Sequence, residues 1–320
     1  ELALFSRSPE IGAWWEQLNK VDSKRAPKPK PDLLDELLFE SGHKHEEILI
    51  RDLKANDKKV KRLSGKMTSE AFEETLDIVH DGKYDFIHQA SLQNNELRGS
   101  ADLLERIDKP SKLGNWSYIP IECKLSSHSK PIYLVQACAY CELLEPILGH
   151  RPENFKLYLG GKKFEREPDG YRLDDFWMWY KKLRYRYQQF IEDFDERQQP
   201  EFSPGDHGHW SSFVEEELEK KRDLILIAGM RQSQRNKLIA SGISTIDELA
   251  KASKSQIKNQ IDEKMFVQLK EQAAIQIRPA QSNGRPAFKI RGEDEQEKGL
   301  SMLPKSDEGD IWFDMEGFPN

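Results

Sequence analysis

Two charged residues interrupt an apolar, strand-like run between Tyr118 and Tyr140. The run reads YIPIECKLSSHSKPIYLVQACAY and places Glu122 and Lys124 one residue apart. Side chains alternate across a strand, so the carboxylate and the ammonium group are predicted to lie on the same face. Asp102 stands upstream in GSADLLER, and a second acid near the first is what a divalent metal site needs. These three residues form a candidate catalytic centre.

The chemistry that suits this set is hydrolysis of a phosphodiester bond. A divalent cation lowers the pKa of a bound water and neutralises charge on the reacting phosphate. Hard cations such as Mg²⁺ take oxygen ligands and keep several waters, so the carboxylates of Asp102 and Glu122 suffice. Lys124 is predicted to position the attacking water or to stabilise negative charge, and an adjacent cation would lower its pKa. The triplet alone is a weak signal, and its apolar context strengthens it.

Length and composition limit the class of protein. The chain has 320 residues, which is enough for one large domain and one or two small ones, and 33% of the residues are charged. No apolar run approaches the roughly 20 residues that span a bilayer, and no signal peptide is visible, so no membrane partner is expected. The three cysteines are too few for a disulfide framework, which favours a cytoplasmic location.

The net charge of −7 argues against a protein that coats nucleic acid by bulk attraction, but it is compatible with a nuclease. Two basic segments are candidates for holding phosphates: residues 54–66 (KANDKKVKRLSGK) and residues 181–186 (KKLRYR). For each segment the alternative interpretation is a solvated helix or loop face.

The apolar patterns predict a mixed α/β core of about 190 residues. Helices are expected from Asp32 through LLDELLFESGHKHEEILIRDL, over residues 68–81, from about 132 to 149, and over 174–197. Strands are expected in YDFIHQASLQ, in ELRGSADLLERI, in the run that holds Glu122, and in FKLYLGG. Gln136 and Tyr140 share one face of the helix that follows Glu122. Their alternative interpretation is an ordinary core tyrosine and a satisfied glutamine.

Composition divides the chain into five segments. Residues 1–197 are predicted to form the α/β domain, 198–210 a linker, 211–280 a helical domain, 281–309 a second linker, and 310–320 the first strand of a domain that continues beyond the chain. IAGM at Ile227, followed by SGISTIDELA, has the spacing of a helical hairpin that presents backbone amides to a phosphate. An ordinary small helical bundle is the alternative.

Taken together, these motifs resemble the PD-(D/E)XK nuclease superfamily in its RecB-like branch. The motifs are Asp102, Glu122-x-Lys124 and Gln136-xxx-Tyr140, preceded by a histidine in GHKHE. The chain is similar to the RecB-like nucleases that are fused to a helicase in bacteria. The similarity extends to IHQASLQ, to DHGHWSSFVEEELEKKRDLILIAGM and to LPKSDEGDIWFDMEGFP, and so covers nearly all of the chain.

The resemblance implies a restriction-endonuclease-like mixed sheet flanked by helices, followed by a small all-α domain like a helix-hairpin-helix. It implies that Mg²⁺ or Mn²⁺ is bound by His45, Asp102 and Glu122. His43 competes with His45 for the position of the histidine ligand. Lys124 would then be the catalytic lysine.

The same resemblance gives Gln136 and Tyr140 a role in supporting the site or touching DNA. It also implies that the chain leads into an RNase H-like exonuclease domain, with Asp314 and Glu316 as its first acids, and then into a superfamily 1 helicase. His207 and His209 lack cysteine or acid partners at ligand spacing and are interpreted as part of a polar loop.

One departure from the family concerns a cofactor. Many RecB-like relatives bind an iron–sulfur cluster through four cysteines, one near the amino terminus and three after the nuclease core. This chain has only three, and all lie inside the core: Cys123, Cys138 and Cys141. No iron–sulfur cluster is therefore expected. Packing that involves Trp14, Trp15 and Trp210 is expected to replace it.

We therefore expect a deoxyribonuclease dependent on Mg²⁺ or Mn²⁺ that acts on single-stranded DNA or DNA ends. Its expected partners are DNA, its own helicase domain and other subunits in DNA repair or phage defence. One alternative is a catalytically silent DNA-binding or protein-docking module of such a helicase. An RNA-directed nuclease is a weaker alternative, because nothing in the sequence recognisably reads a 2′-hydroxyl.

Overall fold

The structure is a computed structural model that describes residues 1–320 except 8–9, 32, 161–167, 202–204, 258–260, 280–285, 290–301, 312 and 314–320. Asp314 and Glu316 thus lie outside the described residues. The chain forms two compact units. The first comprises Glu1–Pro200 and Asp206–Trp210, and the second comprises Glu201–Gly205 and Ser211–Pro319. Within the described ranges, no helix combines the length and apolarity that a membrane crossing requires.

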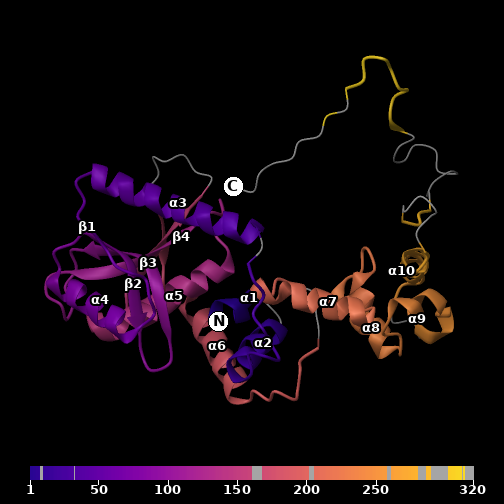
Figure 1. Cartoon of the computed structure of the whole chain (residues 1–320), viewed down its shortest axis with the longest axis horizontal. Helices are drawn as coiled ribbons and strands as arrows, with labels where there is room; N and C mark the ends of the chain where they lie inside the picture. Colours follow the sequence, from indigo (N-terminus) through magenta and orange to yellow (C-terminus); the bar gives the residue numbers. More distant parts are fainter. Residues whose placement is uncertain are drawn as a thin grey trace. The chain divides into compact units, whose positions relative to one another are not determined.

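The first unit is built on a mixed sheet of six strands in the order β1-β2-β3-β4-β5-β6 (Figure 1). The strands are β1 (Val60–Arg62), β2 (Phe86–Gln93), β3 (Arg98–Ile107), β4 (Ser117–Lys124), β5 (Asn154–Leu159) and β6 (Asp169–Arg172). β1 pairs with β2 and β4 with β5 in parallel, and the other neighbours are antiparallel. Each parallel pair is joined through a helix, because parallel strands need a long crossover. The unit has the α/β class that the sequence predicts.

Helices cover both faces of this sheet (Figure 1). On one face lie α4 (Ser69–Asp81) and α5 (Pro131–Leu148), whose Val79 and Leu144 pack against Ile87 and Leu104. On the other lies α3 (Leu33–Ala55), whose Leu49 packs with side chains of β2, β3 and β4. Each helix buries only the stripe that faces the sheet, as its amphipathic pattern requires. The sheet is therefore the rigid support from which side chains reach toward α3.

Three further helices complete the first unit: α1 (Leu2–Arg7), α2 (Glu10–Val21) and α6 (Asp174–Glu192). α6 ends five residues before the predicted boundary, and its Tyr180 and Leu183 pack on the side of α5 that includes Cys138 and Cys141. The two cysteines are thus part of an apolar core.

An aromatic cluster joins α2 to residues 206–210. The Trp15 ring packs edge-on against Trp14 at 5.4 Å and stacks on Trp210 at 6.0 Å. Glu16 accepts hydrogen bonds from Trp210 Nε1 at 3.0 Å and His209 Nε2 at 2.9 Å, and Lys28 adds an ion pair at 2.8 Å. The expected packing of the three tryptophans is present, and its role as a substitute for a cluster stays a prediction.

The second unit is helical. It contains α7 (Ser211–Lys221), α8 (Gln232–Ala240), α9 (Ile246–Lys251) and α10 (Glu263–Gln276), with short 3₁₀ turns between them. Leu224, Leu249 and Phe266 belong to its apolar core. Arg235 forms two hydrogen bonds of 2.7 Å with Asp223, and both side chains are buried. No strand occurs among the described residues of this unit.

Candidate active site

The hairpin of β3 and β4 brings the three predicted catalytic residues together. Leu103 pairs with Ile121 in this antiparallel ladder, so the next residues along, Asp102 and Glu122, face each other. Asp102 Oδ2 accepts a hydrogen bond of 2.7 Å from the Cys123 amide. Lys124 Nζ donates to Glu122 and lies 3.8 Å from Asp102 Oδ2. Strand alternation thus places an acid and a lysine beside a second acid, as predicted.

Burial dominates the electrostatics of this group. The Glu122 side chain is 1% exposed, and burial, with the charge of Asp102 next in size, raises the pKa of Glu122 to about 8. Burial also raises the pKa of Asp102. For Lys124, burial acts to lower the pKa, but the two carboxylates outweigh it and raise the pKa. The lysine is therefore a stable ammonium ion, whereas the acids compete for a proton.

One atom of the centre lacks a partner. Glu122 Oε2 is buried and accepts no hydrogen bond from any described residue. A buried carboxylate oxygen without a donor costs free energy that a fold does not normally carry. A hard divalent cation would supply the missing partner, since carboxylate oxygens are its preferred ligands. The Asp102 and Glu122 pair therefore fits Mg²⁺ or Mn²⁺.

The histidine predicted to complete the ligand set has another contact. His45 lies on α3 as expected, but its ring stacks on Tyr158 of β5 with centroids 4.5 Å apart, and its Nε2 lies 3.4 Å from the Tyr158 carbonyl oxygen. Burial lowers the pKa of His45, so the ring is neutral. His43 is exposed. In the described part of the chain, no group of three or more His, Cys, Asp or Glu side chains is arranged to hold a metal.

Glu46, the residue after His45, contacts β2, whereas His45 contacts β5. Its Oε2 lies 3.1 Å from His88 Nε2 and accepts a hydrogen bond of 3.0 Å from Gln89 Nε2. Burial acts to raise the pKa of Glu46, but these two contacts outweigh it and lower the pKa. The charge of Glu46 contributes in turn to the raised pKa values of Asp102 and Glu122. Glu46 is thus a third carboxylate near the two predicted ones.

The backbone of β2 is distorted where it faces Asp102. Gln89 has φ of 58°, the left-handed region that a non-glycine residue enters at a cost of about 1–2 kcal/mol. Ladder pairs flank it on both sides, His88 with Leu103 and Ala90 with Ala101. The left-handed residue breaks the alternation of β2, so both His88 and Gln89 reach Glu46. Strain of this kind concentrates at functional sites.

Of the two residues of α5 predicted to support the site, Tyr140 contacts the strand that carries Asp102. The Tyr140 hydroxyl donates a hydrogen bond of 2.8 Å to the carbonyl oxygen of Ser100, two residues before Asp102. Gln136 lies one turn earlier on α5, and both residues line a cavity of about 410 Å³ together with Arg98. Tyr140 thereby fixes β3 from the face opposite α3.

Sequence reasoning missed Glu46, His88 and Gln89. The available signal was the polar pair His88 and Gln89 inside IHQASLQ, where an alternating strand has one polar residue at a time. No protein-family model matches the chain, and no curated protein is significantly similar to it. The geometry of its own residues is therefore the basis on which the site is interpreted.

Proposed function

We propose that the first unit is a Mg²⁺- or Mn²⁺-dependent deoxyribonuclease of the PD-(D/E)XK superfamily, in its RecB-like branch and with a restriction-endonuclease-like sheet. The observation that carries the proposal is the buried, unpartnered Oε2 of Glu122 beside Asp102 and Lys124. Burying two acids and one lysine together costs free energy, and such a group has no evident use in packing. They suit a site that gains its remaining stability from a cation.

Each residue of the centre has its own part in the proposed reaction. Asp102 and Glu122 would hold the cation, which when bound supplies a water of lowered pKa and neutralises charge on the phosphate. Lys124, whose pKa the two carboxylates raise, donates a hydrogen bond to Glu122 and would stabilise developing negative charge on the substrate. The amide of Cys123 orients Asp102, and Tyr140 holds the strand that carries it.

The proposed substrate is single-stranded DNA or a DNA end, within a larger helicase and nuclease that serves DNA repair or phage defence in the cytoplasm. One feature of the second unit supports the proposal of a nucleic-acid partner. Gly229 has φ of 81°, and a Cβ added there would meet no atom within 4 Å, so a phosphate can approach its backbone closely. A helix-hairpin-helix role for this unit is part of the proposal.

The experiment is cleavage of labelled single-stranded DNA, duplex DNA and RNA by the purified chain with Mg²⁺ or Mn²⁺. Lys124→Ala and Asp102→Ala should each abolish DNA cleavage while circular dichroism shows that the chain stays folded. Lys156→Ala is the matched control, because Lys156 is also a strand lysine paired with a carboxylate, that of Glu105.

Cleavage by both site variants at the parental rate would show that the site is wrong. Full DNA affinity without cleavage in any divalent metal would instead identify a silent binding module. Cleavage of RNA alone would change the substrate class.

A further inference from the structure

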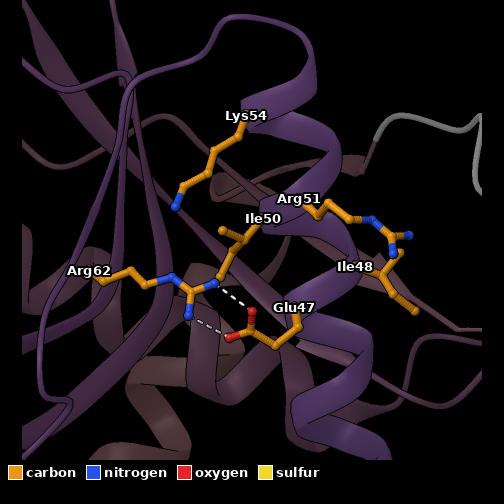
Figure 2. Close-up of a pocket in the computed structure, with 6 residues that line it drawn as sticks. All are labelled: Glu47, Ile48, Ile50, Arg51, Lys54 and Arg62. Atoms are coloured by element: carbon orange, nitrogen blue, oxygen red, sulfur yellow. Dashed lines mark hydrogen bonds and ion pairs between the residues drawn. The ribbon is translucent and has the colours of Figure 1, made fainter.

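An open cavity of about 440 Å³ lies between α3 and the edge strand β1 (Figure 2). Its first lining residue on α3 is Glu47, which directly follows Glu46. Its lining combines two isoleucines, three cations and one acid: Glu47, Ile48, Ile50, Arg51, Lys54 and Arg62. In Figure 2, Lys54 and Arg62 reach into the space between helix and strand, whereas Arg51 extends from the opposite flank of α3. Two of these residues belong to the basic segment 54–66.

The single acid of this pocket is already neutralised. Arg62 forms two parallel hydrogen bonds with Glu47, one of them 2.7 Å long from Nη1 to Oε1. Arg51 is 74% exposed, and its nearest acid is the adjacent Asp52 at 3.8 Å. Lys54 forms no ion pair with any described residue. Three cations against one acid leave a net charge of about +2 on the pocket, which attracts anions.

The pocket adjoins the candidate active site through two chain neighbours. Glu47 directly follows Glu46 on α3, and Arg62 pairs with His88 in the parallel ladder of β1 and β2. Lys54 lies eight residues beyond Glu46, which is about 12 Å along the helix axis at 1.5 Å per residue. At the 3.4 Å rise per nucleotide of duplex DNA, that distance corresponds to about three or four nucleotides, and an extended single strand spans it with fewer.

We propose that this pocket binds the phosphodiester backbone of the substrate strand, a few nucleotides from the bond to be cleaved. Arg51 and Lys54 would each contact a phosphate, and the Arg62 and Glu47 pair would form the wall between them and the active site. The inference rests on the proposed function, because it assumes a nucleic-acid strand in the active site. It assigns phosphate binding to Arg51 and to Lys54, the first residue of segment 54–66, and not to segment 181–186, which lies on α6.

The test is the salt dependence of DNA binding, measured without divalent metal so that it is independent of cleavage. The probe is a fluorescein-labelled oligothymidylate of about 20 nucleotides, titrated with the full chain in EDTA and followed by anisotropy. For a single strand, the slope of log K against log salt falls by about 0.7 for each phosphate that the protein no longer neutralises. The double variant Arg51→Gln, Lys54→Gln should therefore lower the slope by about 1.4 and weaken binding.

Lys181→Gln, Lys182→Gln is the matched control. Both lysines are exposed on α6, and the same two charges are removed, so the parental slope is expected. Glu47→Gln provides a gain of function, since it removes the only acid and releases Arg62. It should tighten binding and raise the slope by about 0.7. Its ion pair is exposed, so the fold should tolerate the change.

The inference is overturned if the pocket variant keeps the parental slope, if the control variant weakens binding as much, if Glu47→Gln binds no tighter, or if the parent does not bind the probe. The proposed function can fail separately. A chain that binds through the pocket but cleaves nothing in Mg²⁺ or Mn²⁺ refutes the nuclease alone. A chain that cleaves with an unchanged slope in the pocket variant refutes the pocket alone.

Discussion

His45 and Glu46 are adjacent on α3, and the family resemblance and the structure differ on which of them belongs to the candidate metal site. The family resemblance selects His45 as a ligand, whereas the structure places its ring on Tyr158 and brings the charge of Glu46 close enough to raise the pKa of both acids. Substituting each residue in turn separates the two assignments. We expect Glu46→Gln to impair metal binding and cleavage, and His45→Ala to leave both close to the parental level.

Glu46→Ala and Glu46→Gln should differ in how far they lower the free energy of unfolding. Glu46→Ala leaves two donors without an acceptor, those of His88 and Gln89, at about 1–3 kcal/mol each when buried. Because the Glu46 side chain is still 15% exposed, we expect the low end, about 2 kcal/mol in total. Glu46→Gln keeps an acceptor for both donors, since both meet the same oxygen, and loses only the charge. It should cost about 1 kcal/mol, as a charged hydrogen bond is roughly twice as strong as a neutral one.

The effect on metal affinity follows from the charge. Glu46 attracts a dication about twice as strongly as it attracts a proton at the same distance. Its removal makes Glu122 and Asp102 easier to deprotonate, but it weakens the attraction for the dication by more. Loss of a group that supports metal ligands typically costs 10–100-fold in affinity, and we expect Glu46→Gln to fall in that range. His45→Ala removes a ring stack worth about 1 kcal/mol and no metal contact.

Calorimetric titration with Mn²⁺ at one fixed pH measures the affinities, and initial cleavage rates measure the consequence. The free energy of unfolding of each variant, from urea titration, separates a loss of ligands from a loss of fold. If His45→Ala abolishes Mn²⁺ binding while Glu46→Gln binds like the parent, the assignment of Glu46 to the metal site is wrong.

Two further predictions concern stability. The pKa of Glu16 is lowered chiefly by hydrogen bonding to His209, against the opposing effect of burial. The contribution of Glu16 to the free energy of unfolding is therefore complete above its unfolded pKa of 4.5 and is lost as the pH falls through the lower folded pKa. Glu16→Gln should therefore flatten the acid side of the stability curve measured by urea unfolding; an unchanged curve would contradict this. In the second unit, Arg235→Ala leaves Asp223 buried and unpaired and should lower the free energy of unfolding by about 3–5 kcal/mol. Thermal unfolding measures this loss. A smaller loss for the double variant Arg235→Leu, Asp223→Leu would identify the unpaired charge as the cause.

The parts of the fold that can be predicted from the sequence are those set by local patterns. The strand with Glu122 and Lys124 is predictable because a short continuous apolar run indicates a buried strand, in which every second side chain lies on the same face. α4 is predictable with both ends, since Thr68 caps it and Gly82 closes it at φ of 62°. Asp102 can be placed beside Glu122 because a hairpin connection forces neighbouring strands to pair.

The parts that cannot be predicted depend on tertiary contacts. β1 and β6 have three and four residues and pair only with strands brought beside them by the rest of the fold, so no pattern marks them. Glu46 stands in a run of two glutamates on an amphipathic helix, where the face that each one occupies depends on how the helix is docked. The left-handed conformation of Gln89 has no signal in residue type, since glutamine rarely adopts it.

The periodicity of α3 explains how one helix serves two tasks. At 3.6 residues per turn, consecutive residues point about 100° apart. Glu46 therefore meets His88 and Gln89 above the sheet, while Glu47 turns outward to Arg62 at the sheet edge. A substrate strand held on the outer face would be fixed relative to the acids by the same rigid backbone, without a hinge between them. A glycine substitution between the two faces, at Ile48, should therefore weaken cleavage more than it weakens DNA binding.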